Sequence, residues 1–241
     1  MAAEFSNVYD DRARAQAYAE LEFPGTYYLA YRDLPAIIGE HVRGRRALDF
    51  GCGAGRSTRF LRKLGFDAVG VDISEHMLAQ ARERDPGAEY RLVVDGDLGA
   101  FAPGTYDLVL SAFTFDNIPT IEKKITLLSS LKRLLKSDGR IVNLVSAPDI
   151  YVNEWASFST KDFPENRNAR SGDKVLIVML DVEDRRPIED VLCTDSDYHE
   201  AYKRAGLSSI ETYRPLAKQS ETREWVSETT IAPWVIYVLG P

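Results

Sequence analysis

Cysteine is scarce in this sequence, and there is no excess of basic residues. Two cysteines, Cys52 and Cys193, are too few for a disulfide framework, so we expect a reducing compartment, the cytoplasm. Lysine and arginine number 30 against 37 aspartate and glutamate residues, which gives a net charge of −7. An acidic chain offers no overall positive field to a phosphate backbone, and this argues against nucleic acid as a partner.

Long apolar runs are missing as well. Residues 1–10 lack an apolar signal core, and no run approaches the roughly 18 apolar residues that a membrane helix needs. We therefore expect neither export nor a membrane partner. No spacing among His, Cys, Asp and Glu suggests a metal site. The sequence makes no prediction about oligomeric state.

What the chain does contain is a regular alternation of strand and helix signals. Short apolar runs end at glycine or acidic residues, and segments with helical spacing follow them. This rhythm predicts an α/β fold, a Rossmann-like and mostly parallel sheet with helices on both faces. We expect seven strands, near residues 46–50, 68–71, 90–94, 106–112, 141–145, 210–213 and 234–239.

The strongest motif is the glycine loop at residues 49–55, DFGCGAG, between a strand and a helix. Gly51, Gly53 and Gly55 allow a tight turn and a close approach of backbone to ligand, beside the free N–H groups of a helix start. Asp72 ends the next strand, where a carboxylate can accept both hydroxyls of a ribose. A tight turn followed by a helix-capping acid is the simpler alternative.

Two nucleotide ligands fit this pattern. A nicotinamide dinucleotide site would carry glycine or alanine at position 56, where this chain has Arg56. Asp49, two residues before the first glycine, would repel a pyrophosphate but suits the ammonium group of a methionine moiety. A nicotinamide-dependent oxidoreductase remains an alternative at this point.

A further acid follows the third strand. Asp97 can accept a hydrogen bond from an adenine amino group while the N–H of Leu98 faces a ring nitrogen. Ile73 and Met77 can pack on the faces of the ring. Asp49, Asp72 and Asp97 thus follow three successive strands, as the parts of one adenosine-containing ligand would require.

These motifs together resemble the class I S-adenosylmethionine-dependent methyltransferases. The matching segments are residues 49–55, 69–74 (VGVDIS), 96–98 (GDL) and 106–111 (YDLVLS). The resemblance implies a seven-stranded sheet with a reversed last strand and a donor, S-adenosyl-L-methionine, that becomes S-adenosyl-L-homocysteine. It implies the three loop glycines at the methionine end, Asp72 at the ribose, Asp97 at the adenine, and Ser111 near the sulfonium.

The acceptor side is read from residues 113–119, FTFDNIP, which follow the fourth strand. Family members that methylate nucleic acid bases or protein amides carry Asp/Asn-Pro-Pro-aromatic there, and Ile118 and Thr120 depart from that pattern. We therefore expect a small-molecule acceptor, with Phe115 and Asn117 beside it. A predicted N-terminal helix could place Tyr28 or Arg32 on the methionine carboxylate.

The chain is expected to form one domain, residues 1–241. Its parts are an N-terminal helical cap (1–40), a donor-binding core (41–148), an acceptor lid (149–195) and a C-terminal part of the core (196–241). The lid is predicted where the strand–helix rhythm breaks, with two antiparallel strands near 174–180 and 187–193. Its aromatic residues Tyr151, Trp155 and Phe158 could wall an acceptor site.

We therefore predict transfer of a methyl group from S-adenosylmethionine to an O, N or C atom of a small molecule. Candidates for a general base are Asp116, His199 and Tyr9. A non-catalytic S-adenosylmethionine-binding module, a sensor or scaffold, is a further alternative.

Overall fold

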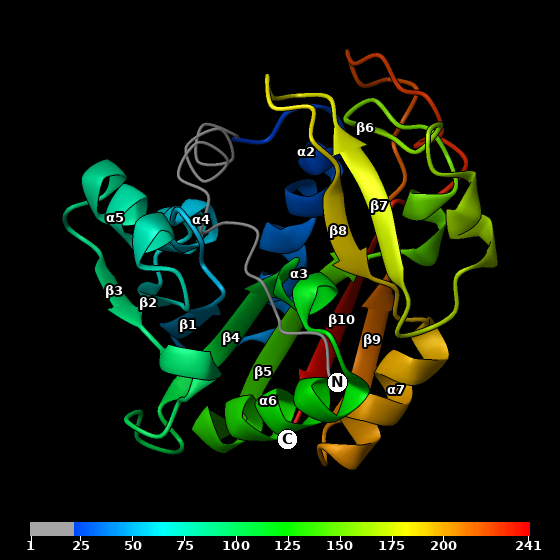
Figure 1. Ribbon diagram of the computed structural model, residues 1–241. Helices are drawn as coiled ribbons and strands as arrows, with labels where there is room; N and C mark the ends of the chain where they lie inside the picture. Colours follow the sequence, from blue (N-terminus) through cyan, green and yellow to red (C-terminus); the bar gives the residue numbers. More distant parts are fainter. Residues whose placement is uncertain (1–21) are drawn as a thin grey trace.

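The computed structural model describes residues 22–241 (Figure 1). Its main sheet has seven strands in the order β3-β2-β1-β4-β5-β10-β9. Strands β1 to β5 are parallel to one another, whereas β10 runs antiparallel to both of its neighbours. The predicted Rossmann-like fold, with its reversed last strand, is thus confirmed.

The strands of this sheet fall close to the predicted positions. They are β1 (Arg46–Phe50), β2 (Asp67–Asp72), β3 (Glu89–Leu92), β4 (Tyr106–Ala112), β5 (Leu135–Ser146), β9 (Ser208–Tyr213) and β10 (Trp234–Gly240). Four of the connecting segments between these strands form helices, and two further helices precede β1 in the described chain. The helices are α2 (Gly25–Arg32), α3 (Leu34–His41), α4 (Arg56–Lys63), α5 (Glu75–Arg84), α6 (Ile121–Leu134) and α7 (Asp195–Arg204).

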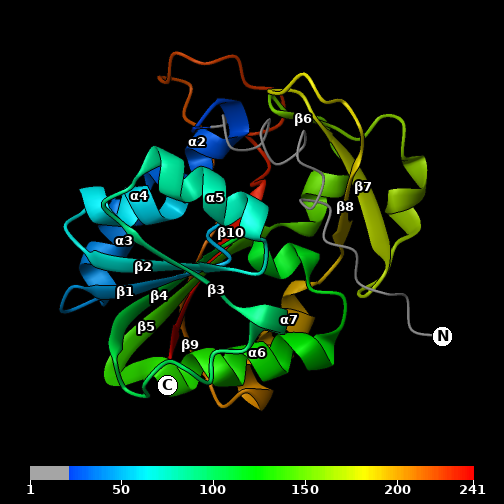
Figure 2. The same ribbon diagram turned by 60° about the vertical axis from the view of Figure 1, so that its left-hand side comes forward.

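Helices cover both faces of the sheet (Figure 2). On one face, α3 and α4 pack over Ala47 and Leu108 in the larger hydrophobic cluster, which also takes in α2. On the other face, α6 and α7 pack over Val109 and Ile141. Burial on both faces explains why the central strands read as continuous apolar runs in the sequence.

Between β5 and α7 the chain forms a separate small sheet, which we call the lid (residues 147–193). Its strands are β6 (Phe158–Ser159), β7 (Lys174–Met179) and β8 (Ile188–Val191), in the order β6-β7-β8. Figure 1 shows β7 and β8 beside the main sheet rather than within it. The antiparallel pair β7–β8 was predicted, but β6 was not, because two residues are too few to show a period.

The lid is not an appendage. Trp155, Phe158 and Ile177 share one hydrophobic cluster with α2 and with Trp234 of β10. Strand β8 also packs on the short 3-10 turn η3 (Thr114–Asn117) that follows β4. Among residues 22–241, no helix is long and apolar enough to span a bilayer.

Candidate functional site

The glycine loop leaves β1 and enters α4 through three residues in the left-handed region. Gly51 packs so tightly against the η3 turn that an added Cβ would lie 2.1 Å from Thr114 Oγ1. A Cβ on Gly53, by contrast, would meet only Met77 Cε, at 3.0 Å, so this side of the loop is open. The loop thus touches the end of β4 and leaves space above Gly53 for a ligand.

Asp72, the last residue of β2, is tied to the glycine loop. One carboxylate oxygen accepts from the backbone N–H of Gly53 and the other from that of Ser74, each at 2.8 Å. The Ser74 side chain in turn caps α5 by accepting from Met77 N–H. The carboxylate is therefore held in place before any ligand binds.

Asp49 lies fully buried beneath the loop. Its Oδ2 accepts from the hydroxyls of Ser57 (2.7 Å) and Thr58 (2.6 Å), which belong to the first turn of α4. Its Oδ1 has no hydrogen-bond partner among the described residues. Burial raises the pKa of this carboxyl to about 6. A buried acceptor oxygen without a partner suits a protonated amine at this loop, as S-adenosylmethionine carries on its methionine moiety.

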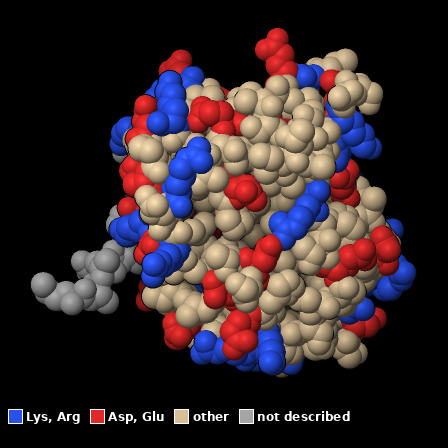
Figure 3. Space-filling model, turned by 90° about the vertical axis from the view of Figure 1, so that its right-hand side faces the viewer, with Lys and Arg blue, Asp and Glu red and all other residues tan. Residues whose placement is uncertain are grey.

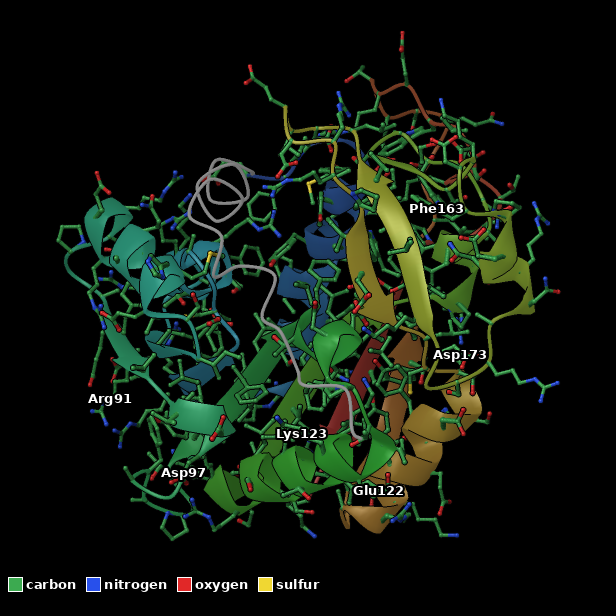
Figure 4. The ribbon with its side chains drawn as sticks, viewed as in Figure 1. Arg91, Asp97, Glu122, Lys123, Phe163 and Asp173 are labelled. Atoms are coloured by element: carbon green, nitrogen blue, oxygen red, sulfur yellow. The ribbon has the colours of Figure 1, made fainter. Side chains whose placement is uncertain are left out.

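The residues expected at the adenine ring differ in exposure and position in the structure. Ile73 follows Asp72 with 42% of its surface exposed, whereas Met77 is buried under the loop. The Asp97 carboxylate accepts from the N–H of Gly99 at 2.7 Å, and Leu98 packs into the core. Figure 4 shows Asp97 far from the lid, beside α6. Its role and that of Leu98 at an adenine ring stay predictions.

The N-terminal helix corrects one expectation. Arg32 does not face the glycine loop, because its guanidinium donates to Asp33 and to Glu221 (2.8 Å). Tyr28 lies on the same side of α2, with the Arg223 guanidinium over its ring at 4.2 Å. The predicted carboxylate ligands therefore turn toward Asp33, Glu221 and Arg223 instead.

The adjacent side of α2 contacts the start of α4. The rings of Tyr27 and Tyr31 lie 4.9 and 5.5 Å from the guanidinium of Arg56, the first residue of α4. Arg56 stands where a dinucleotide-binding loop would carry glycine or alanine. In the structure its guanidinium contacts both tyrosines and so holds α2 against the start of α4.

A cavity of about 40 Å³ lies between the η3 turn, the end of β5 and the lid. Its aromatic walls are Tyr27, Phe113, Tyr151, Phe158 and Trp234. Three isoleucines complete the apolar lining, namely Ile150, Ile177 and Ile188. The polar lining consists of Asp116, Asn117, Ser146 and Asp190. Since one water needs roughly 10–15 Å³, the space can hold a few waters or a small functional group.

Two carboxylates form the polar part of this cavity. Asp116 Oδ2 accepts from the N–H (3.1 Å) and the hydroxyl (2.8 Å) of Ser146, and burial raises its pKa to about 6. Asp190 Oδ2 accepts from the Tyr151 hydroxyl at 3.0 Å. Burial and the neighbouring Asp116 raise the pKa of Asp190 to about 8. Of the predicted acceptor-side residues, the structure thus brings together Asp116, Asn117, Tyr151 and Phe158.

Other predicted acceptor-side residues belong to the packing instead. Phe115 is fully buried against Phe50, with ring centroids 6.1 Å apart, because the η3 turn directs it into the core. Trp155 is buried inside the lid, where its Nε1 donates to Ile150 O at 2.9 Å. Neither residue lines the cavity. Phe163, labelled in Figure 4, lies on the outer part of the lid and does not line it either.

Ser111 is the second-to-last residue of β4, and its role near the sulfonium stays a prediction. It lies within β4, opposite Asn143 of β5, on the face that α6 and α7 cover, as the alternation with Val109 requires. Its side chain is completely buried, so the strand end itself is formed by the residues that follow.

The base candidate His199 does not line the cavity. His199 is exposed on α7, where its Nδ1 lies 3.2 Å from Ser209 Oγ. Tyr9 falls outside the described residues. Glu40, His41 and Glu211 form a cluster with metal-ligating atoms within 4.8 Å of one another, but His41 Nε2 already pairs with the Tyr213 hydroxyl at 2.7 Å.

Sequence reasoning missed several cavity residues. Phe113 has a left-handed backbone (φ 65°), uncommon for a bulky residue and frequent where strain serves a site. Asp190 had a visible signal, since period-two alternation puts it on the same face of β8 as Ile188. An acidic residue on the apolar face of a strand is unusual, and it could have identified Asp190 as a candidate site residue. Trp234 gave no such signal, because an aromatic residue in a strand is ordinary.

Comparison with known proteins agrees with this geometry. A family model described as "Methyltransferase domain" matches residues 48–143. A ubiquinone biosynthesis O-methyltransferase of Methylococcus capsulatus is 34% identical over 104 residues, which are 42% of this chain and 43% of the relative. The chain thus spans less than half the length of that relative. An uncharacterized methyltransferase of Bacillus licheniformis is 30% identical over 169 residues, 67% of this chain and 72% of the relative.

Solved structures show the same fold. A putative S-adenosylmethionine-dependent methyltransferase from Listeria monocytogenes superposes with a TM-score of 0.64 at 18% identity, covering 88% of this chain and 96% of that one. An S-adenosylmethionine-dependent methyltransferase from Mesorhizobium loti superposes with a TM-score of 0.62 at 20% identity, covering 88% of this chain and 98% of that one. Given the fold, the glycine loop with its tied Asp72, and these relatives, the chain belongs to the class I S-adenosylmethionine-dependent methyltransferases.

Proposed function

We propose that the protein transfers a methyl group from S-adenosylmethionine to a small molecule whose reacting group enters the cavity under the lid. One observation carries this proposal. The η3 turn touches the glycine loop through Thr114, whose Oγ1 donates to Phe50 O at 2.9 Å. The same turn walls the cavity with Phe113 and Asn117. Donor loop and acceptor cavity therefore share one short segment.

The residues around the glycine loop fit the donor. Asp72 would accept the ribose hydroxyls from its fixed position at the end of β2, and Asp49 Oδ1 would accept from the ammonium group. Gly53 leaves room for the donor backbone, and the exposed side chain of Ile73 would pack on the adenine ring. The methionine carboxylate would lie near the start of α4, beside Arg56, whose guanidinium also donates to Glu22 O at 2.9 Å. When bound, the donor supplies a methyl group on a positively charged sulfur, an already activated electrophile.

The protein's own contribution is then positioning and exclusion of water. The aromatic walls restrict the orientation of a bound group, and orientation alone can be worth effective molarities on the order of 10⁵ M. Asp116, a base candidate from the sequence that lines the cavity, accepts hydrogen bonds from Ser146 and can hold the acceptor by hydrogen bonding.

Charge and thiol chemistry support a cytoplasmic enzyme that acts on metabolites. On the face shown in Figure 3, basic and acidic side chains are interspersed, with neither sign gathered into a continuous patch. Together with the net charge of −7, this disfavours a nucleic acid backbone as partner. Both cysteines are free and buried, as expected for a reducing compartment.

Methyl-labelled S-adenosylmethionine tests the proposal. Incubated with the protein and a bacterial cell extract, the label should pass to low-molecular-weight products and leave protein, DNA and RNA unlabelled. Enzyme-dependent label in purified macromolecules would contradict the small-molecule assignment. Calorimetry that detects no binding of S-adenosylhomocysteine would contradict the donor assignment.

A further inference from the structure

The lid contributes an acid whose hydrogen bonding is incomplete. Asp190 is 8% exposed and lines the cavity, and its Oδ2 accepts from Tyr151. Among the described residues its Oδ1 has no hydrogen-bond partner. A carboxylate oxygen left without a partner in so buried a place is costly unless a ligand or water supplies a donor.

The cavity as a whole offers acceptors rather than donors. The hydroxyls of Tyr151 and Ser146 already donate to Asp190 and Asp116. The Asn117 amide group donates to Phe113 O at 3.3 Å, which leaves its carbonyl oxygen free to accept. Among the described residues, no lysine, arginine or histidine lines the cavity. An anionic acceptor group would meet two carboxylates with no cation to balance it.

The walls favour a cation as well. The ring centroids of Phe113 and Trp234 are 4.8 Å apart. The ring of Tyr27 stacks on that of Trp234, with 5.7 Å between the centroids. The faces of such rings attract a positive charge, by about 2 kcal/mol when the charge is desolvated. Aromatic walls with a carboxylate at one end are the arrangement that binds an organic ammonium group.

The charges behind the cavity leave one carboxylate in excess once Asp190 is ionised. Lys124 of α6 is 2% exposed, and its ammonium donates to Phe115 O and interacts electrostatically with Asp116 and Asp190. Above about pH 8, one buried cation therefore faces two ionised acids. A second positive charge would then complete the balance, and the cavity between the acids is the open place for it.

We propose that the cavity binds the amino group of the acceptor, so that the substrate is a small amine and Asp190 receives the proton that the amine must lose. This inference rests on the proposed function. An ammonium nitrogen has no lone pair and cannot attack a methyl group. Its N–H bond breaks as the Asp190 O–H bond forms, which gives a neutral amine and a neutral carboxylic acid. The nitrogen lone pair then forms the new N–CH₃ bond as the carbon–sulfur bond of the donor breaks.

The electrostatics of the cavity suit this proton transfer. Burial raises the pKa of Asp190 to about 8. This value is closer than the ordinary pKa of an aspartate to the pKa of a simple alkylamine, which is about 10.4 for the lysine side chain. The charged and titratable groups around it are Tyr151, Asp116, Lys124 and Glu189. Since a cation binds the ionised form, the affinity of the cavity for an ammonium ion should rise as the pH increases through about 8.

Methylammonium is a probe small enough for the cavity. Added to the full chain loaded with S-adenosylhomocysteine, above about pH 8, it should cause saturable NMR shifts at the backbone amides of Ser146 and Ile188. Acetate should cause none. Asp190→Asn should abolish the methylammonium shifts, while Glu189→Gln, a change on the next residue of β8, should preserve them. Shifts that acetate also produces, or that survive Asp190→Asn, would overturn the proposal.

A second measurement identifies the product class. Labelled products from the extract, separated by ion exchange at neutral pH, should behave as cations. Label that appears in neutral or anionic small molecules would overturn the amine assignment while leaving the methyltransferase proposal intact. Asp190→Asn should lower the transfer rate at least tenfold at pH 8 or above, where Asp190 is ionised, and leave the dissociation constant of S-adenosylhomocysteine within twofold. Equal loss of donor affinity in that variant would instead indicate a structural role.

Discussion

The acids around the glycine loop and the acids in the cavity are held in different ways. Asp49 bonds to side chains 8 and 9 residues away, and Asp72 to backbone groups 2 and 19 residues away. In the cavity, Asp116 bonds to a residue 30 positions distant, and Asp190 to one 39 positions distant. The donor site is thus built within one strand–loop–helix unit and its neighbour, whereas the acceptor cavity exists only once the lid has packed on β4 and β5.

Gly53→Val should break the donor side most severely. A β-branched residue at φ 53° is strained, and its side chain would occupy the open space over the loop. We expect S-adenosylhomocysteine affinity, measured by calorimetry, to fall about 100-fold or more, or about 2.7 kcal/mol. Gly104→Val, at a similar φ of 63° with nothing within 4 Å, is the matched control. Equal affinity in both variants would show that the loop is only a turn.

Asp72→Ala should have a smaller effect on the same property. Loss of hydrogen bonds to a charged group costs about 1.5–3 kcal/mol, so the dissociation constant should rise about 10- to 150-fold. The control is Asp67→Ala, an exposed residue at the opposite end of β2. Unchanged affinity in Asp72→Ala would remove the ribose assignment.

The cavity acids should give the stability an unusual pH dependence. The folded pKa of Asp190, about 8, lies above its ordinary value of 3.8, so the folded state keeps a proton that the unfolded state has released. The resulting stabilisation is complete below pH 3.8 and disappears as the pH rises through about 8. The free energy of unfolding should therefore fall over this range, by about 1.4 kcal/mol for each unit between the two pKa values.

Asp190→Asn isolates that contribution, because the amide does not titrate. Urea denaturation at a series of pH values should show a flatter profile for this variant between pH 6 and 8, while Glu189→Gln follows the unmodified chain. If the Asp190→Asn profile keeps its full slope, the proton is bound elsewhere, and Asp116, with a pKa of about 6, is the next candidate.

The smallest effect is expected at Arg32. Its guanidinium pairs with Asp33 and Glu221, so Arg32→Ala should cost no more than about 1 kcal/mol of stability and leave donor affinity within twofold. Arg56→Ala should lower donor affinity by more than twofold, because Arg56 stands at the start of α4. A larger loss for Arg32→Ala than for Arg56→Ala in calorimetry would reverse our assignment of the methionine carboxylate.

Sequence reasoning reached the sheet, its order of elements and the glycine loop because these depend on short-range patterns. The run Arg46–Phe50, the turn that follows and α4 all carry their signals within a few residues. It misplaced Tyr28 and Arg32 for an equally local reason. Helical spacing shows which residues share a face, but it does not say which face of an isolated helix turns toward the site.

By itself, the sequence determined the fold and the family, and it located the glycine loop with Asp49 and Asp72, whose role at the donor stays a prediction. Tertiary structure alone decided that Phe115, Trp155 and Ser111 are buried and that Asp116, Tyr151 and Asp190 meet in one cavity. The physical reason is that burial and pKa depend on what packs above a residue. For the cavity, that cover comes from β8 and β10, which are distant in the chain from the η3 turn.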